Sequence, residues 1–243
     1  MRESVAIVTG ASRGIGAAIA LRLARAGMLV ACLSRSGAMP EGAEEGDADR
    51  LLAFVADVTD PDAVRVASAA AVDGRRLVGF VNNAGLHTEA RSADLTIDDW
   101  NTQISANAAS VLIGCQAAYP HLRGDGGLIV NIGSFFDKLG VKRNLAYCAS
   151  KAAVGAITRV LAVEWARERI AVIDVAPGYI ATSLNRDVMS EGPLRAYLEK
   201  RIPAGTPGDA DDVARLVAGL FAIDVRFLSG ETIYLDGGQG IAH

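Results

Sequence analysis

Tyr147 and Lys151 are the two residues whose types and spacing most clearly could do chemistry. They stand four positions apart in the sequence Tyr-Cys-Ala-Ser-Lys, and on a helix this spacing puts both side chains on one face. The phenol of an unperturbed tyrosine has a pKa of about 10, and a neighbouring ammonium group lowers this value by stabilising the phenolate. The pair therefore predicts a proton donor and acceptor that works near neutral pH.

A tyrosine and a lysine at this spacing also occur together by chance. The alternative interpretation is a surface helix on which the tyrosine packs beneath the aliphatic stem of the lysine. A glycine-rich turn near the N-terminus argues for chemistry, because Thr9–Gly16 follows an apolar run and leads into a helical pattern over residues 17–26. Such a turn lets a diphosphate approach the backbone and sit on the free N–H groups of a helix. Its position at the first strand-to-helix junction predicts a nucleotide site.

Short apolar runs rich in β-branched residues alternate along the chain with longer segments of helical period. This alternation indicates βαβ units, and strands without a polar alternate face indicate a parallel sheet that helices cover on both sides. We therefore predict an α/β fold, a single-domain Rossmann-type doubly wound parallel sheet of about seven strands, with ligands at the carboxyl ends of the strands. The predicted strands are 5–9, 28–33, 51–55, 77–82, 127–132, 170–175 and 232–235.

Two segments interrupt this alternation. Residues 36–49 are rich in glycine and acidic residues and contain Pro40, so we predict a mostly irregular acidic loop there instead of a full crossover helix. Residues 182–209 carry apolar side chains at roughly helical spacing, broken by Gly192-Pro193, and this pattern predicts a mobile helical flap over the site. Its apolar residues are Leu184, Val188, Met189, Leu194, Tyr197, Leu198 and Ile202.

The composition favours a protein that acts on small molecules. Hydrophobic residues make up 51% and charged residues 21% of the 243 residues, a balance that suits a sizeable core. The net charge of -4 comes without any run of lysines or arginines, so we expect neither nucleic acid nor a membrane as a partner. No composition break or internal repeat divides the chain, and we predict one domain over residues 1–243.

The N-terminus and the cysteines indicate a cytoplasmic protein. The apolar run Val5–Val8 begins almost at once. It is preceded neither by a basic leader nor by an apolar segment long enough for export. Cys32, Cys115 and Cys148 are odd in number and lack CxxC spacing. We therefore expect three reduced thiols and no metal site.

These motifs together resemble those of the short-chain dehydrogenase/reductase family. The glycine spacing in Thr9–Gly16 matches the TGxxxGxG pattern of that family, and the resemblance covers nearly the whole chain. Several independent motifs also occur in the family's order, so chance is a poor explanation. They are Asp57-Val58, Asn82–Gly85, Asn107, Ser134, Tyr147–Lys151, Pro177-Gly178, Ser229-Gly230 and Asp236–Gly238.

The resemblance implies an oxidoreductase with four catalytic residues. Tyr147 would exchange a proton with the substrate oxygen, while Lys151 would tune the tyrosine and bond the nicotinamide ribose. Ser134 would hold the substrate oxygen, and Asn107 would anchor a water that relays protons to Lys151. Taken alone, Ser134 could instead cap a turn, and Asn107 could be a polar residue that the backbone satisfies.

The end of the second strand predicts NADP(H) as the coenzyme. A carboxylate there would hold a free ribose 2′-hydroxyl and repel a 2′-phosphate, but this chain has Ser34 followed by Arg35. Arg13 in the glycine loop can add a second positive charge facing the same phosphate. The alternative interpretation is that both arginines are ordinary surface charges.

Further coenzyme contacts follow from the resemblance. Asp57 would bond the adenine amino group, residues 83–85 would line the adenosine ribose, and residues 177–182 would hold the nicotinamide. The full predicted set is Gly10, Ser12, Arg13, Gly14, Ile15, Gly16, Ser34, Arg35, Asp57, Val58, Asn83, Ala84, Gly85, Tyr147, Lys151, Pro177, Gly178, Ile180 and Thr182.

The residues next to Ser134 bear on the substrate. Phe135 and Phe136 follow it directly and favour an apolar or aromatic-lined pocket. Tyr179, Met189 and Leu198 could extend this pocket, and packing within the core is their alternative role. His87 follows the turn at residues 82–85 and could face the substrate.

Within the family, the 3-oxoacyl-(acyl-carrier-protein) reductases are the natural comparison, and they receive an acidic carrier protein on surface arginines. Arg123, Arg167 and Arg169 would lie at the ends of helical segments that flank the site. Gly133 and Ile173, however, stand where many relatives carry serine and asparagine. We therefore expect a small-molecule ketone or secondary alcohol as substrate, with a 3-oxoacyl thioester and an acyl-carrier protein as open candidates.

Two other functions stay open. One is an alcohol or sugar dehydrogenase that works in the oxidative direction, and the other is a dinucleotide-binding regulator without turnover, against which the intact four-residue site argues. The resemblance also implies a homotetramer, with the helical segments near 105–120 and 150–166 packing across a two-fold interface.

Overall fold

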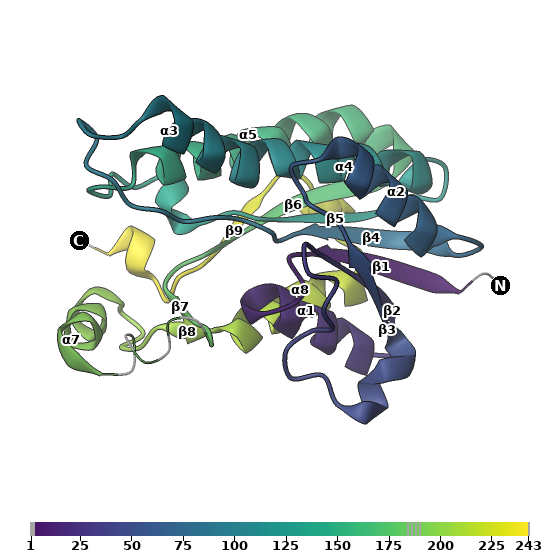
Figure 1. Cartoon of the computed structure of the whole chain (residues 1–243), viewed down its shortest axis with the longest axis horizontal. Helices are drawn as coiled ribbons and strands as arrows, with labels where there is room; N and C mark the ends of the chain where they lie inside the picture. The colour runs from purple at the N-terminus through teal and green to yellow at the C-terminus, as the bar shows by residue number, and fades with distance from the viewer. Residues whose placement is uncertain (1–2, 184, 186, 188, 190, 243) are drawn as a thin grey trace.

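The chain folds around a parallel β-sheet of seven strands (Figure 1). The computed structural model describes residues 3–183, 185, 187, 189 and 191–242. Across the sheet the order is β3-β2-β1-β4-β5-β6-β9, with strands β1 Ser4–Thr9, β2 Leu29–Ser34, β3 Leu51–Val55, β4 Arg76–Asn82, β5 Gly127–Ile132, β6 Ile170–Pro177 and β9 Thr232–Leu235. The predicted doubly wound sheet is confirmed, and each of the seven predicted strands ends within two residues of the observed one.

Helices cover both faces of the sheet (Figure 1). On one face α2, α4 and α5 bury Leu122, Ile129 and Val154 in one apolar cluster. On the other face α1 and α8 bury a second cluster that includes Ile19 and Val217. This double cover explains why the inner strands are apolar on both sides. The helices are α1 Gly14–Arg25, α2 Pro61–Val72, α3 Ile97–Ile104, α4 Ser110–Leu122, α5 Leu145–Trp165 and α8 Ala210–Ala222.

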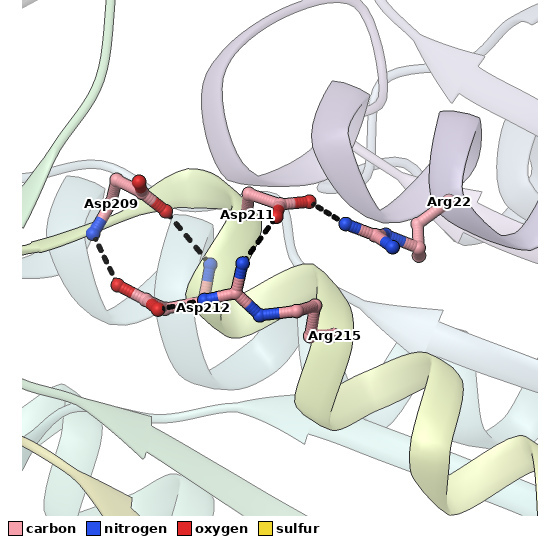
Figure 2. Close-up of polar contacts among 5 residues, drawn as sticks. All are labelled: Arg22, Asp209, Asp211, Asp212 and Arg215. Atoms are coloured by element: carbon pink, nitrogen blue, oxygen red, sulfur yellow. Dashed lines mark hydrogen bonds and ion pairs between the residues drawn. The ribbon is translucent and has the colours of Figure 1, made fainter.

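A network of charged side chains joins α1 to the start of α8 (Figure 2). Arg22 on α1 forms an ion pair with Asp211, whose other oxygen lies 2.6 Å from a guanidinium nitrogen of Arg215. Asp209 and Asp212 cap the helix reciprocally, because the side chain of each accepts a backbone N–H of the other, at 2.8 and 2.9 Å. The network therefore fixes both the start of α8 and its contact with α1.

The crossover between β2 and β3 is mostly irregular, as predicted for residues 36–49. Its only regular piece in the described chain is a short 3₁₀ helix, Glu45–Arg50. Arg25 of α1 holds this piece through two hydrogen bonds to the carboxylate of Asp47, at 3.0 and 2.8 Å. The acidic loop is therefore tied to the rest of the fold by an ion pair.

The segment predicted as a helical flap contains helix α7, Gly192–Arg201. Two residues on each side of the segment pair as a short parallel ladder, β7 Ile180–Ala181 with β8 Gly208–Asp209. Leu198 is fully buried, so the packing alternative holds for this residue. The helical content after Gly192 is confirmed, Leu184 and Val188 lie outside the described residues, and the mobility of the segment stays a prediction.

Helix α5 is unusually apolar in composition. Together with the residues after it, over Leu145–Glu168, it is long and apolar enough to cross a membrane by length and composition alone. In the fold, however, α5 packs against β6 and buries Lys151 and Thr158 on its sheet-facing side. We therefore interpret α5 as a helix that covers one face of the sheet and contributes to the core.

Candidate active site

The chain reverses its direction across the sheet between β1 and β4, and a cleft of about 1150 Å³ opens at the carboxyl ends of the strands near this point. In doubly wound sheets such a switch point is where ligands bind, because the two neighbouring loops diverge there. The loops after β1, β2 and β4 all contribute lining residues. The sequence-predicted location of the ligand site therefore coincides with this cleft.

The glycine loop is shaped for close approach of a ligand to its backbone. Gly10 and Gly14 adopt positive φ angles of 65° and 58°, which other residues rarely adopt. A Cβ atom at Gly16 would lie 2.3 Å from the carbonyl oxygen of Gly10. Helix α1 begins after Arg13, and no side chain caps its N-terminus in the described structure. Its first N–H groups thus remain available for a phosphate.

Thr9 joins the glycine loop to the turn after β4. Its hydroxyl donates to the carbonyl of Val81 at 3.3 Å and accepts the backbone N–H groups of Asn83 and Ala84 at 3.0 and 3.2 Å. The side-chain amide of Asn83 in turn donates to the carbonyl of Thr9 at 3.0 Å. These contacts hold two walls of the cleft at a fixed separation.

The residues expected at the adenosine end lie together at the cleft. Arg13 and Arg35 are exposed, and neither forms an ion pair within the described part of the chain. Ser34 is buried, and its hydroxyl accepts the N–H of Gly37 at 3.1 Å. Hydrogen bonds from Thr59 lower the pKa of Asp57 below its usual value, and the charge of Arg35 adds to this effect. Two arginines without ion-pair partners among the described residues, together with the neutral Ser34, suit a dinucleotide that carries an extra phosphate.

All of the predicted coenzyme residues line this cleft or an adjoining cavity of about 340 Å³. Ile15, Asn83 and Thr182 line both, so the two spaces are neighbours. The first cleft is lined by Gly10, Ser12, Arg13, Gly14, Ile15, Gly16, Ser34, Arg35, Asp57, Val58, Asn83, Ala84, Gly85 and Thr182. The second cavity is lined by Tyr147, Lys151, Pro177, Gly178 and Ile180. Sequence reasoning missed further lining residues, namely Ser36, Ala38, Ala56, Thr59, Leu86, Asn101, Thr102, Ser105 and Ala106.

Ser134, Tyr147 and Lys151 meet at the second cavity. Ser134 follows β5, and its hydroxyl accepts the N–H of Phe136 at 3.3 Å, so it caps a short 3₁₀ turn as well as facing the cavity. Tyr147 and Lys151 stand on the first turns of α5. The ammonium nitrogen of Lys151 donates to the carbonyl of Ile132 at 2.8 Å and lies 5.7 Å from the centre of the Tyr147 ring.

The pKa of Tyr147 differs from the sequence-based expectation. Burial raises it above its usual value, and a hydrogen bond with Ser134 opposes this rise. Burial is the largest influence on this pKa, so the net lowering expected from Lys151, whose ammonium nitrogen donates to the carbonyl of Ile132, is not observed in the described structure. Burial also lowers the pKa of Lys151 to about 8, and the charge of Asp174 works against that change.

Asn107 lines neither cavity and lies on a π-helical turn, Ser105–Ala109, between α3 and α4. It is fully buried, and its side chain clamps Leu86 by accepting the N–H at 2.6 Å and donating to the carbonyl at 2.8 Å. A further hydrogen bond of 3.0 Å reaches the hydroxyl of Ser150 on α5. The side chain of Asn107 is thus bonded to the backbone, which was the alternative role expected from the sequence. Single π-helical turns of this kind are also frequent at functional sites.

Aromatic rings form one wall of the second cavity. The ring centres of Phe135 and Phe136 lie 5.5 and 6.1 Å from that of Tyr179, and Phe136 packs edge-on against Tyr147 at 5.9 Å. His87 stacks at 4.6 Å from Tyr147 and contacts the side chain of Asn144 at 2.5 Å. The predicted aromatic pocket is therefore present, and His87 lines it together with Met189.

Two sequence-based expectations need correction or addition. Arg123 and Arg169 lie just before β5 and β6, at the amino-terminal edge of the sheet, whereas the catalytic residues stand at the carboxyl edge. They therefore do not flank the site, and Arg167, at the far end of the 21-residue α5, is roughly 30 Å from its start. Sequence reasoning also missed Asp174, a fully buried carboxyl in β6. A charged residue inside an otherwise apolar strand was the signal that could have found it.

Comparison with known proteins places this geometry in a family. A family profile described as Enoyl-(Acyl carrier protein) reductase matches residues 10–239. The chain belongs to the short-chain dehydrogenase/reductase family. It is accordingly an oxidoreductase that acts on CH–OH groups with an NAD(P)(H) coenzyme.

Similar proteins differ widely in what their names say they act on. The chain is 33% identical to the 3beta-hydroxysteroid dehydrogenase 1 of Eggerthella lenta, over 98% of this chain and 94% of that protein. It is 35% identical to the 3-oxoacyl-(acyl-carrier-protein) reductase MabA of Mycobacterium bovis, over 98% and 93%. A solved structure of a putative NAD(P) dependent gluconate 5-dehydrogenase from Beutenbergia cavernae, with bound NADP, is 30% identical with a TM-score of 0.88 and covers 100% of this chain and 98% of that chain. Similarity therefore establishes the family of this chain but does not identify its substrate.

Proposed function

We propose that this protein is an NADP(H)-dependent oxidoreductase that interconverts a ketone and a secondary alcohol, with Tyr147 as the general acid and base. The observation that carries the proposal is the meeting of Ser134, Tyr147 and Lys151 at a cavity that shares lining residues with the dinucleotide cleft. Such an arrangement brings a substrate oxygen and a bound coenzyme to one place.

The proposed roles follow from the positions of the side chains. When bound, the coenzyme supplies or accepts the hydride. Ser134 orients the substrate oxygen by donating a hydrogen bond, and Tyr147 gives that oxygen a proton during reduction or removes one during oxidation. The ammonium group of Lys151 stabilises the phenolate of Tyr147 and bonds the nicotinamide ribose. Asn107 would hold the water that connects Lys151 to solvent.

The preference for NADP(H) over NAD(H) rests on three residues at the adenosine end. Arg13 and Arg35 face the cleft without ion-pair partners among the described residues, and Ser34 offers no negative charge. Guanidinium groups bind phosphate through several N–H donors in a planar fork. The described cleft thus favours the extra phosphate of NADP(H).

A panel of substrates tests the proposed activity. NADPH consumption is measured with ketones that carry alkyl, aryl or polyol substituents and with 3-oxoacyl thioesters, and NADP⁺ reduction with the matching alcohols. We expect turnover with at least one pair and its loss in Tyr147→Phe. Folded protein that binds NADPH but turns over none of these compounds would support a dinucleotide-binding regulator instead.

The polar groups of the second cavity favour a second candidate, the oxidation of a sugar or polyol. His87 and Asn185 line the same cavity as the aromatic side chains, and hydroxyl groups of a sugar are natural partners for such polar side chains. The ratio of the two directional kcat/KM values at neutral pH distinguishes the candidates. A ratio in favour of polyol oxidation would select the second.

Quaternary structure and location are part of the proposal. Helices α4 and α5 expose large apolar side chains to solvent. The exposed fractions are 40% for Leu112 on α4 and 54% and 80% for Val160 and Val163 on α5. Burial of such residues between copies supports the homotetramer. Light scattering that gives a monomer would contradict it. The three free cysteines suit a cytoplasmic location.

A further inference from the structure

Asp174 is a buried carboxyl whose presence the fold itself does not explain. It lies in β6 between Ile173 and Val175, and all three residues are fully buried. Its neighbours across the sheet are Asn131 on β5 and Thr232 on β9. Placing an ionisable group in such an interior is costly unless a partner compensates for it. The carboxyl of Asp174 therefore requires a compensating partner nearby.

Helix α5 brings Lys151 close to Asp174. Lys151, Gly155 and Thr158 recur at helical spacing on the buried side of α5, so they face the sheet together. A Cβ atom at Gly155 would lie 3.9 Å from Oδ2 of Asp174. Gly155 is four residues after Lys151, which corresponds to about 6 Å along a helix. The carboxyl thus packs against α5 about one turn from the ammonium-bearing residue.

Gly133 makes room for the carboxyl on its other side. A Cβ atom at this position would lie 2.3 and 2.8 Å from the two carboxyl oxygens of Asp174, closer than any real contact. Gly133 also follows Ile132, whose carbonyl accepts the ammonium N–H of Lys151 at 2.8 Å. Glycine at position 133 therefore leaves space for the carboxyl of Asp174. This space adjoins the carbonyl oxygen of Ile132, which accepts the hydrogen bond from Lys151.

The hydrogen bonds of the carboxyl are incomplete. Oδ2 accepts from the hydroxyl of Thr232 at 3.1 Å, while Oδ1 has no hydrogen-bond partner among the described residues. A buried carboxylate with so few donors depends on a nearby positive charge for its stability. Lys151 provides that charge from the helix that covers this part of the sheet.

The other charged groups around Asp174 are on the three elements that pack near it. From α5, the guanidinium of Arg159 reaches Gly155, with one nitrogen 3.3 Å from the position of a Cβ there. After β5, Asp137 accepts the hydroxyl of Tyr234 of β9 at 2.9 Å. Burial raises the pKa of Asp174 to about 6, with Lys151 opposing and Asp137 adding to the rise. Between this value and the pKa of about 8 for Lys151, both groups are charged.

We propose that Asp174 is a positioning residue for Lys151: its buried carboxylate, admitted by the absence of a side chain at Gly133, keeps Lys151 in its charged form and thereby sets the pH range of proton transfer by Tyr147. The inference rests on the proposed function of Tyr147 and Lys151. It adds a buried carboxylate that is not among the residues lining the second cavity.

The direct test follows the ionisation of Lys151 without any turnover. The chain has four lysines, Lys138, Lys142, Lys151 and Lys200, so NMR of the side chains in protein with isotope-labelled lysine is tractable. The variant Lys151→Met assigns the signal. In Asp174→Asn, which keeps the shape of the side chain, we expect the titration of Lys151 in coenzyme-free protein to move to lower pH by roughly one unit. An unchanged titration overturns the proposal.

Turnover provides the second measurement. With the pair of ketone and alcohol found by the substrate panel, the rise of kcat for oxidation with pH should move to higher pH in Asp174→Asn, because a neutral Lys151 stabilises the phenolate of Tyr147 less. A shift of one pH unit corresponds to about a tenfold lower kcat on the rising limb, while KM stays close to that of the wild type. A uniform fall of kcat with an unshifted profile would indicate a merely structural role and overturn the proposal.

Matched controls separate charge from packing. Thr158→Val alters the same buried side of α5, where the Thr158 hydroxyl accepts from Asn131 at 2.9 Å, but it removes no charge, so we expect a lower Tm with no shift of the Lys151 titration. Gly133→Ala should lower the Tm in the wild type and much less in the Asp174→Ala background, since the clash is with the carboxyl. Equal losses in both backgrounds would contradict the spatial argument.

The proposed function and this inference fail in different ways. If Tyr147→Phe keeps its turnover, the proposed catalytic role is wrong, whatever the titration of Lys151 shows. If Tyr147→Phe is inactive but Asp174→Asn leaves both the NMR titration and the pH profile unchanged, only the role of Asp174 is wrong.

Discussion

The two ends of the site handle charge in opposite ways. At the adenosine end, Arg13 and Arg35 are exposed at the rim of an open cleft. At the nicotinamide end, Lys151 is 5% and Asp174 0% exposed. Exposed cations act by recognition of a charged ligand, whereas buried groups shift each other's pKa and act on protons. Coenzyme choice should therefore be adjustable with little effect on folding, while changes at the inner end should alter catalysis and stability together.

The largest expected effect is at the inner end, in Tyr147→Phe. Loss of the phenolic proton should lower kcat by roughly 10²–10⁴-fold, because the side chain keeps its packing but has no proton to exchange. NADPH binding, measured by fluorescence titration, should remain within a few-fold of the wild type. If Tyr147→Phe lost NADPH binding to the same degree as turnover, the separate roles of the two ends in binding and in proton transfer would be contradicted.

The next effect concerns the stability of the inner end. The pKa of Asp174 is raised to about 6 in the fold, so its contribution is favourable below its unfolded pKa of about 3.9 and is lost as the pH rises through 6. Asp174→Asn should therefore gain stability relative to the wild type between pH 4 and pH 7. The upper limit is roughly 3 kcal/mol, and the attraction to Lys151 is already contained in the pKa of about 6.

Urea unfolding of both proteins at several pH values measures this difference. Thr232→Val serves as the comparison, since it removes only the hydrogen bond to Oδ2 and keeps the charge. A difference between the wild type and Asp174→Asn that does not change with pH would mean that the carboxyl is not titrating in this range.

At the outer end, Arg35→Ala should weaken NADPH binding by about 1–3 kcal/mol, the size of a charge-assisted hydrogen bond. NADH binding should hardly change, because NADH lacks the 2′-phosphate. Ser34→Asp should reverse the preference by adding a repulsive carboxylate. Dissociation constants for both coenzymes provide the measurement, and equal losses for both would show that Arg35 is an ordinary surface charge. The Tm of Arg35→Ala should match that of the wild type.

The smallest effect is expected far from either end, at the ion pair between Arg22 and Asp211 (Figure 2). Both side chains are more than 40% exposed, so Arg22→Ala should cost at most about 1 kcal/mol of unfolding free energy. High salt should reduce the difference between this variant and the wild type. Kinetic constants should stay unchanged, and a change in them would mean that α8 is coupled to the site.

Much of the outer end could be predicted from the sequence because its determinants are local. Each of the seven strands is a run of apolar, β-branched residues that is continuous in the sequence. The glycine loop likewise requires Gly10, Gly14 and Gly16 for backbone reasons that act within a few residues. The coenzyme residues therefore fell at the cleft once the order of elements was known.

The inner end depended on contacts that the sequence does not display. Asp174 matters only because the register of β5 and β6 sets it beside Gly133 and because α5 turns Gly155 toward it. The arginines at 123, 167 and 169 do lie at the ends of helical segments, as predicted, but these ends are at the edge of the sheet away from the site, which the sequence does not show. The net rise of the pKa of Tyr147 could not be foreseen either, because it comes from burial of the phenol, which depends on how distant parts of the chain pack around it.

The two-residue ladder between β7 and β8 has a consequence for the length of the segment that it closes. It joins Ile180 and Ala181 to Gly208 and Asp209, so residues 182–207 form a closed loop whose ends are tied together outside the seven-stranded sheet. Lengthening such a loop adds only a slowly growing entropy cost. The length of this stretch can therefore change at little cost in stability, while the strands and the helix that carry the catalytic residues keep their places.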